Sequence, residues 1–226
     1  LLEIFEEVFN HKAFTGRSGT FFGYEGLGSI YWHMLSKLLL AVQENCLLAV
    51  RNNESEAVIG KLFDHYYEIQ AGIGVHKSPQ LYGAFPTDPY SHTPATKGAQ
   101  QPGMTGQVKE DILSRFGELG IVVFDGVLSF KPSLLRKQEF LAKDQGFNYI
   151  DVGRNKQTLP VSAGSLAFTY CQVPVIYTKS LQESVLVVFK DGEEKTFERL
   201  KLDKTTSEKL FQRTGEINHI IVKLIK

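Results

Sequence analysis

The chain has 226 residues, of which 42% are hydrophobic, and its 25 Lys and Arg balance its 25 Asp and Glu. This length suits one large domain or two small ones. Because the charge is balanced and forms no basic stripe, nucleic acid and anionic membrane surfaces are poor candidates for partners. The absence of a long apolar run argues against a membrane span.

The first residues, LLEIFEEVF, are charged and amphipathic, which is unlike a secretory signal. We therefore expect a cytoplasmic protein. The chain does not begin with Met and starts inside a predicted helix, so we expect a piece of a longer protein. Cys46 and Cys171 have no motif spacing and are expected to be reduced.

Apolar residues recur at helical spacing through the first half of the chain. This periodicity predicts helices over 1–9, about 30–50, about 55–70 and about 107–119. Ser29 is the expected N-cap of the second helix and Ser55 or Glu54 that of the third, which should end at Gly72 and Gly74. The two long helices form a predicted antiparallel hairpin. In the fourth, the residues expected to face inward are Val108, Ile112, Leu113, Phe116 and Leu119.

After Gly120 the hydrophobic period changes to two, which indicates strands. Asp125-Gly126 between two apolar runs predicts a β-hairpin over 121–130. Further strands are predicted at 138–142, 165–172, 174–178, 184–190, 194–200 and 217–225, with a short helix over Thr205–Arg213 that starts near Thr206 or Ser207. The expected fold class is thus α+β, with a helical part at 1–120 and an antiparallel β-sandwich at 121–226.

The stretch Asp88–Gly120 joins a proline-rich polar loop to an amphipathic helix and is the candidate site. Thr105-Gly106 stands where that helix should begin, and unpaired N–H groups at a helix start favour an anion. His33, in the first turn or so of the 30–50 helix, could present a ring nitrogen to the same cleft. The ordinary alternatives are an N-cap for Thr105-Gly106 and a hydrogen-bonded core imidazole for His33.

The polar loops are also rich in aromatic residues, which often hold sugars together with hydrogen-bonding side chains. Glu25 is the one candidate for a catalytic acid or base, and it could equally cap the next helix. For Asp88 the alternative is turn formation, and for Glu110 and Asp111 the helix dipole is a sufficient explanation. No metal-ligand spacing is present. The candidate substrate-binding residues are Tyr24, Glu25, Asp88, Tyr90, His92 and Gln101.

Four short motifs follow one another in a characteristic order. They are Gly28-Ser29-Ile30-Tyr31-Trp32-His33, Asp88-Pro89-Tyr90, Thr105-Gly106 and Gly126-Val127-Leu128-Ser129-Phe130-Lys131-Pro132. In this order they resemble the C-terminal part of the family 94 glycoside phosphorylases, the cellobiose and chitobiose phosphorylase group. The resemblance covers about residues 15–135. This chain differs from the family in having Gly103-Met104 before Thr105-Gly106 and Gln107-Val108 after it.

The resemblance implies the last helices of an (α/α)₆ barrel followed by a jelly-roll-like β domain. It implies that His33, Thr105 and Gly106 hold the phosphate that attacks the anomeric carbon, with phosphate as co-substrate and no other cofactor. The family's general-acid Asp lies upstream, so this piece alone should be inactive. The implied partners are an oligosaccharide or β-glucan and the rest of the parent barrel, with a homodimer possible. The alternatives are an inverting hydrolase with Glu25 as base, or a non-catalytic glycan-binding piece.

Overall fold

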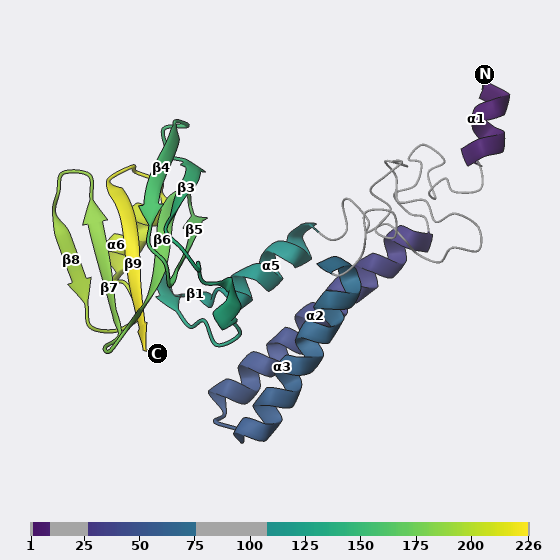
Figure 1. Ribbon diagram of the computed structural model, residues 1–226, viewed down its shortest axis with the longest axis horizontal. Helices are drawn as coiled ribbons and strands as arrows, with labels where there is room; N and C mark the ends of the chain where they lie inside the picture. The colour runs from purple at the N-terminus through teal and green to yellow at the C-terminus, as the bar shows by residue number, and fades with distance from the viewer. Residues whose placement is uncertain (1, 10–26, 76–107, 226) are drawn as a thin grey trace. The chain divides into compact units, whose positions relative to one another are not determined.

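The computed structural model describes residues 2–9, 27–75 and 108–225 (Figure 1). The chain divides into two compact units, a helical unit of residues 1–115 and a β unit of residues 116–226. The helices are α1 (Leu2–Phe9), α2 (Leu27–Arg51), α3 (Glu56–Gln70), the π-helical turn η2 (Ala71–Val75), α5 (Val108–Glu118), the 3₁₀ turn η3 (Lys137–Glu139) and α6 (Lys204–Phe211). The expected α+β class is confirmed.

The helical unit contains the predicted hairpin of α2 and α3. Asn52 and Asn53 form the turn, with Asn53 in the left-handed region at φ 54°. The Ser55 hydroxyl accepts a hydrogen bond from the Val58 backbone N–H, so Ser55 is the N-cap, as predicted. Ser29 is not a cap, because α2 already begins at Leu27. The glycines at 72 and 74 do not end the hairpin either, since η2 continues the helical path there.

A buried amide joins three helices of this unit. The Gln43 side chain on α2 donates from Nε2 to the Tyr66 hydroxyl on α3 at 3.1 Å and to the Ser114 carbonyl oxygen on α5 at 2.7 Å. Gln43, Tyr66 and Ser114 are all buried. Both amide protons are therefore satisfied in a dry environment, where an unmade hydrogen bond is costly.

The exposed and buried sides of α5 differ from the prediction. Leu119, just beyond the helix, is buried as expected, but Ile112 is 48% exposed and Leu113 is 52% exposed. Glu110 and Ser114, one helical turn apart, are buried instead. The expectation that Ile112 and Leu113 face inward is thus wrong for the described residues, where the polar side of the helix is the covered one.

The β unit consists of a five-stranded sheet, two separate β-hairpins and one helix. The strands are β1 (Ile121–Phe124), β2 (Val127–Phe130), β3 (Gln145–Ile150), β4 (Lys156–Val161), β5 (Ser165–Tyr170), β6 (Val173–Ser180), β7 (Ser184–Phe189), β8 (Glu194–Phe197) and β9 (Ile217–Ile225). The large sheet has the order β5-β6-β9-β7-β8, with β6 and β9 parallel and its other neighbours antiparallel. The pairs β1–β2 and β3–β4 are antiparallel hairpins.

Two parts of the strand prediction are wrong. Residues 138–142 are not a strand, because η3 and an irregular segment occupy them. The hairpin β3–β4 was not predicted at all. The parallel pairing of β6 with β9 makes the large sheet mixed, although its other pairs are antiparallel, in line with the mostly antiparallel arrangement that was expected. The remaining strands and the short helix α6 lie close to their predicted positions.

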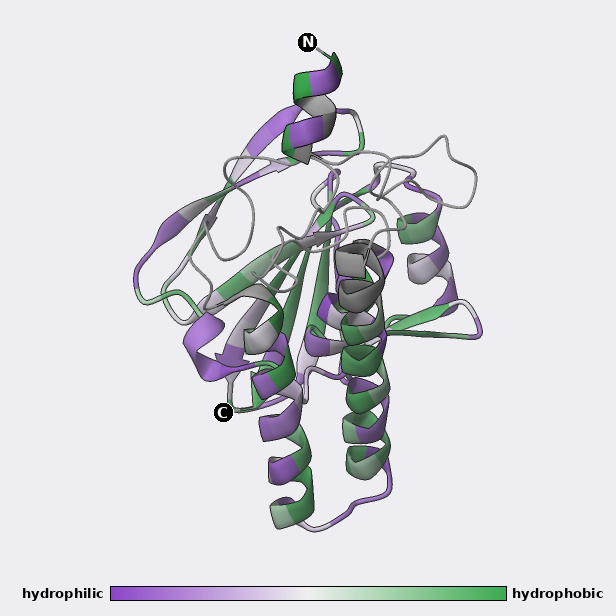
Figure 2. Ribbon diagram, turned by 90° about the vertical axis from the view of Figure 1, so that its right-hand side faces the viewer, coloured by the Kyte–Doolittle hydropathy of each residue, from purple (hydrophilic) through white to green (hydrophobic). Residues whose placement is uncertain are grey.

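Hydrophobic side chains from the sheet, from β2 and from α6 form the core of the β unit. Tyr177 on β6 lies at its centre and makes edge-to-face contacts with Phe130 and Phe168, with ring centroids 6.1 and 5.2 Å apart. Its hydroxyl donates to the Leu119 carbonyl oxygen at 2.5 Å. Figure 2 shows hydrophobic residues in green along the central strands and along the helices of the hairpin. Among the described residues, no helix is both long and apolar enough to cross a membrane.

The helix α6 is capped by Asp203, one residue before its start. The carboxylate accepts hydrogen bonds from the Thr206 N–H at 2.7 Å and from Lys195 Nζ at 2.6 Å. Desolvation acts to raise the pKa of Asp203, but these hydrogen bonds outweigh it and lower that pKa from 3.8 to about 2. Thr206 and Ser207 follow inside the helix and are buried.

Replacing Asp203 with Asn is expected to remove an acid-sensitive part of the stability. Because the folded-state pKa is depressed, the ionised carboxylate stabilises the fold above pH 3.8 and this contribution disappears as the pH falls toward 2. We expect D203N, which keeps a capping side chain but loses the charge paired with Lys195, to lower the free energy of unfolding by about 1 kcal/mol at pH 7 and by much less near pH 2. Urea unfolding followed by circular dichroism at both pH values measures this. D125N, in an exposed turn of the same unit, is the matched control; an equal loss for D203N at both pH values would contradict the assignment.

Candidate functional site

The predicted phosphate and sugar site lies almost wholly outside the residues that the structure describes. This applies to Tyr24, Glu25, Asp88, Tyr90, His92, Gln101, Thr105 and Gly106. The backbone of His33 is described and lies within α2. Because the helix starts at Leu27, His33 is in its second turn rather than its first. The roles of these residues stay predictions.

Two described helices, α2 and α5, are adjacent in sequence to the predicted anion-site motifs: α2 contains position 33, and α5 follows Thr105-Gly106. Gln43 and Ser36 lie on one buried face of α2, seven residues apart, and position 33 precedes Ser36 by three residues. Gln43 binds the Ser114 carbonyl of α5, and α5 begins at Val108, two residues after Gly106. In Figure 1 each of these helices descends from its N-terminal end toward the lower left.

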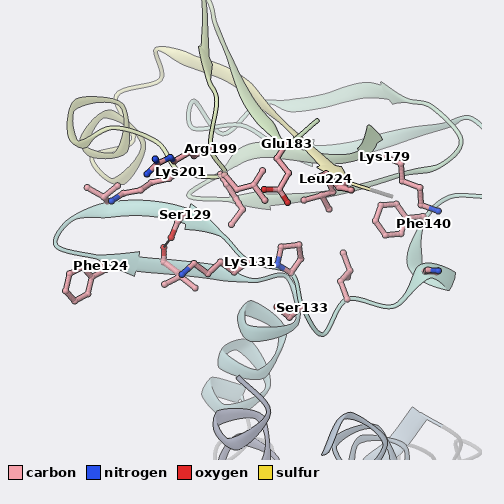
Figure 3. Close-up of a pocket in the computed structure, with 18 residues that line it drawn as sticks. Phe124, Ser129, Lys131, Ser133, Phe140, Lys179, Glu183, Arg199, Lys201 and Leu224 are labelled. Carbon is pink, nitrogen blue, oxygen red and sulfur yellow. Dashed lines mark hydrogen bonds between the residues drawn. The ribbon is translucent and has the colours of Figure 1, made fainter. Parts of the chain in front are cut away.

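The β unit contains a groove with a volume of about 820 Å³ (Figure 3). The hairpin β1–β2 and the segment that follows it form one side. The ends of β6 and β9 and the segment 199–201 form the other. The hairpin turn has Asp125 at φ 48° and Gly126 at φ 70°, as a two-residue turn between twisted strands requires. The backbone of Leu128 and Phe130 bonds to residues 202 and 200, which fixes the two sides relative to each other.

Cations dominate the polar lining of this groove, which we call the basic groove. It contains five Lys and Arg side chains but one carboxylate, that of Glu183, in a chain whose formal net charge is zero. Within the described part of the chain, none of the five forms a salt bridge, although Lys179 Nζ lies 5.2 Å from the centre of the Phe140 ring. The five cations are Lys131, Lys137, Lys179, Arg199 and Lys201.

Apolar side chains form most of the rest of the basic groove, and several of them are exposed. Phe124 is 81% exposed at the tip of the hairpin, and Ile225 is 62% exposed at the end of β9. Val122, two residues before Phe124, is also exposed on the same side of β1. A concave surface that combines open apolar walls with cations that form no salt bridge among the described residues has the features of a binding site rather than of ordinary surface.

A second, smaller pocket of about 260 Å³ surrounds the turn between β3 and β4. Asp151 organises it: its carboxylate accepts from the Asn155 N–H at 2.9 Å and from Gln157 Nε2 at 3.0 Å, and its carbonyl oxygen accepts from Gln172 Nε2 at 3.0 Å. The hydrogen bond from the Asn155 backbone is the main cause of the lowered pKa of Asp151. These bonds account for the arrangement as a turn-stabilising network.

The described residues offer little for metal or thiol chemistry. Within these ranges no three His, Cys, Asp or Glu side chains come together as a cluster that could hold a metal ion. Cys46 and Cys171 are free, as expected from their spacing. Burial raises the pKa of both thiols, so neither is activated as a thiolate at neutral pH.

Comparison with known proteins adds no relative. No protein-family model matches the chain, and no curated protein matches its sequence.

Proposed function

We propose that the chain is the C-terminal portion of a carbohydrate-active enzyme of the (α/α)₆-barrel type, which cleaves a β-glycoside by inverting phosphorolysis. The observation that carries this proposal is the link between α2 and α5. The helix that contains His33 is tied through Gln43 to the helix that follows Thr105-Gly106. The two motifs of the anion site thus precede neighbouring parts of one packed helical unit.

Uncovered apolar faces of the helical unit support the barrel part of the proposal. On α2, Met34 is 61% exposed, and Leu38 and Leu48 continue the same stripe at helical spacing. Ile112 and Leu113 form a second exposed apolar surface on α5. In a ring of helical hairpins each hairpin packs against neighbours on both sides, so we assign these faces to other hairpins of the parent protein.

The chemistry follows from the expected anion site. N–H groups at the start of α5 and the His33 imidazole would hold phosphate next to the anomeric carbon. An acidic side chain elsewhere in the parent would protonate the glycosidic oxygen while phosphate attacks from the opposite face, inverting the anomeric configuration. Tyr24, Glu25, Asp88, Tyr90, His92 and Gln101 would contact the sugar.

One observation favours an inverting hydrolase as the second candidate. Glu110 lies in the first turn of α5 and is only 2% exposed. Partial burial and, next, repulsion from Glu110 raise the pKa of its neighbour Asp111. A buried carboxylate near the helix start would repel a phosphate bound there. It could instead accept a proton from water and so activate the water for attack. The candidate base for a hydrolase is then Glu110 in addition to Glu25.

The test uses the full-length parent protein and a panel of β-linked gluco-oligosaccharides, with and without inorganic phosphate. We expect sugar 1-phosphate, detected by ³¹P NMR, to form only when phosphate is present. We expect H33A to lower kcat/KM for phosphate by about 10²- to 10³-fold. His65→Ala is the matched control, because His65 is an exposed residue of α3 whose ring nitrogen contacts Glu68 at 3.3 Å.

Equal cleavage in phosphate-free buffer would reject phosphorolysis in favour of hydrolysis, and E110Q would then be expected to abolish turnover. Glycan binding without any cleavage would instead support a non-catalytic glycan-binding protein.

A further inference from the structure

We propose that the basic groove of the β unit binds an acidic oligosaccharide, that is, a glycan chain bearing carboxylate or sulfate groups. The carbohydrate nature of the ligand rests on the proposed function. Its negative charge and its extended form are inferred from the groove itself.

The positive charge of the groove favours a negatively charged ligand. Five cations and one carboxylate line it, a formal excess of four positive charges, while the whole chain is neutral. Like charges gathered on one surface repel one another, and the structure shows no salt bridge that relieves Lys131, Arg199 or Lys201 within the described ranges. A bound anion would supply the missing partner charge.

The separation of the cations along the groove favours an extended ligand. Figure 3 shows Arg199 and Lys201 toward one end of the groove and Lys179, beside Phe140, toward the other, with Glu183 between them. These groups belong to separate segments, since Lys179 lies in β6, one residue before its end, while Arg199 and Lys201 follow β8. One small anion cannot reach both ends, whereas a chain with charges at intervals can.

The apolar walls favour a glycan over other polyanions. Sugar rings present C–H faces that pack on aromatic and aliphatic side chains, here Phe124, Phe140 and Leu224. The ring of Phe140 is additionally held under Lys179, which places an apolar face and a cation side by side. Glu183 provides an acceptor for hydroxyl groups in the middle of the groove.

The experiment is calorimetric titration of the chain with hexameric oligogalacturonate at low ionic strength. The neutral comparison is cellohexaose, and the peptide comparison is hexaglutamate. We expect oligogalacturonate to bind at least tenfold more tightly than either, with an affinity that falls as NaCl is added. We expect the double variant K131Q/K201Q to lower the affinity about tenfold and K131R/K201R to retain it.

The matched control is K143Q/K156Q, which removes two exposed cations of the same unit that do not line the groove. It should leave the affinity unchanged, and all the variants should keep the circular dichroism spectrum of the original chain. Equal binding of cellohexaose, tighter binding of hexaglutamate, absence of binding or an equal loss in the control would each overturn the proposal. The titration requires neither phosphate nor turnover, so its failure is distinguishable from failure of the phosphorolysis assay on the parent protein.

Discussion

Replacing Gly120 with Ala is expected to destabilise the β unit severely. Gly120 has φ +67°, and a Cβ atom there would lie 2.0 Å from the Lys131 carbonyl carbon and 2.2 Å from the Pro132 nitrogen. Both are backbone atoms that cannot rotate away. The same residue accepts the Lys131 N–H at 2.7 Å, so separating the two segments would also break that hydrogen bond. We expect a loss of at least about 4 kcal/mol, a large share of a typical domain's stability.

Gly126→Ala provides a closely matched control. Gly126 has φ +70°, but a Cβ atom there meets no heavy atom within 4 Å. G126A should therefore cost only the backbone strain, about 1 kcal/mol. Urea unfolding of the two variants separates strain from steric overlap. Similar stabilities for G120A and G126A would show that the close approach of Gly120 to Lys131 is unimportant.

Replacing Tyr177 with Phe is the second substitution with a large expected effect. The change retains the ring and its contacts with Phe130 and Phe168 but removes the hydroxyl that binds the Leu119 carbonyl oxygen. Tyr177 is fully buried and Leu119 nearly so, so the carbonyl oxygen would be left without this donor in a dry environment. We expect the free energy of unfolding to fall by about 1–3 kcal/mol.

Tyr149→Phe is the control for Tyr177→Phe, because Tyr149 is a partly exposed tyrosine of β3 in the same unit. Thermal and urea unfolding should show little change for Y149F. If Y177F were as stable as Y149F, the hydrogen bond to Leu119 would contribute nothing net to the fold.

Most helices and strands could be predicted from the sequence because their apolar periodicity is strong. The prediction was wrong where tertiary contacts override that periodicity. Strand β4 contains Pro160, and Gly, Asn and Asp residues surround the β3–β4 turn, so this stretch resembles a loop. Residues 138–142 are apolar enough for a strand, yet Leu141 makes one pair of backbone hydrogen bonds, with Gly164 and Ser165, and no ladder follows from it. The burial of the polar side of α5 could not be predicted, because Gln43, which binds Ser114 there, lies on a helix far away in the sequence.

The basic groove was beyond sequence reasoning for a related reason. Its cations come from four separate segments, and their proximity depends on the order of the strands in the sheet. Isolated lysines in a neutral chain give no signal of a shared surface. The predicted anion site depends on local motifs instead, so His33 and Thr105-Gly106 could be nominated without a structure. Their roles remain predictions.

The central position of β9 has a consequence for synthesis on the ribosome. Residues 217–225 are the last strand along the described chain, yet they lie between β6 and β7 in the sheet. Until these residues leave the exit tunnel, the β5–β6 and β7–β8 pairs have no shared neighbour and expose the edges of β6 and β7. The sheet therefore cannot close before residues 217–225 have emerged. A nascent chain stalled before Ile217 would present two open edges that invite aggregation or chaperone binding.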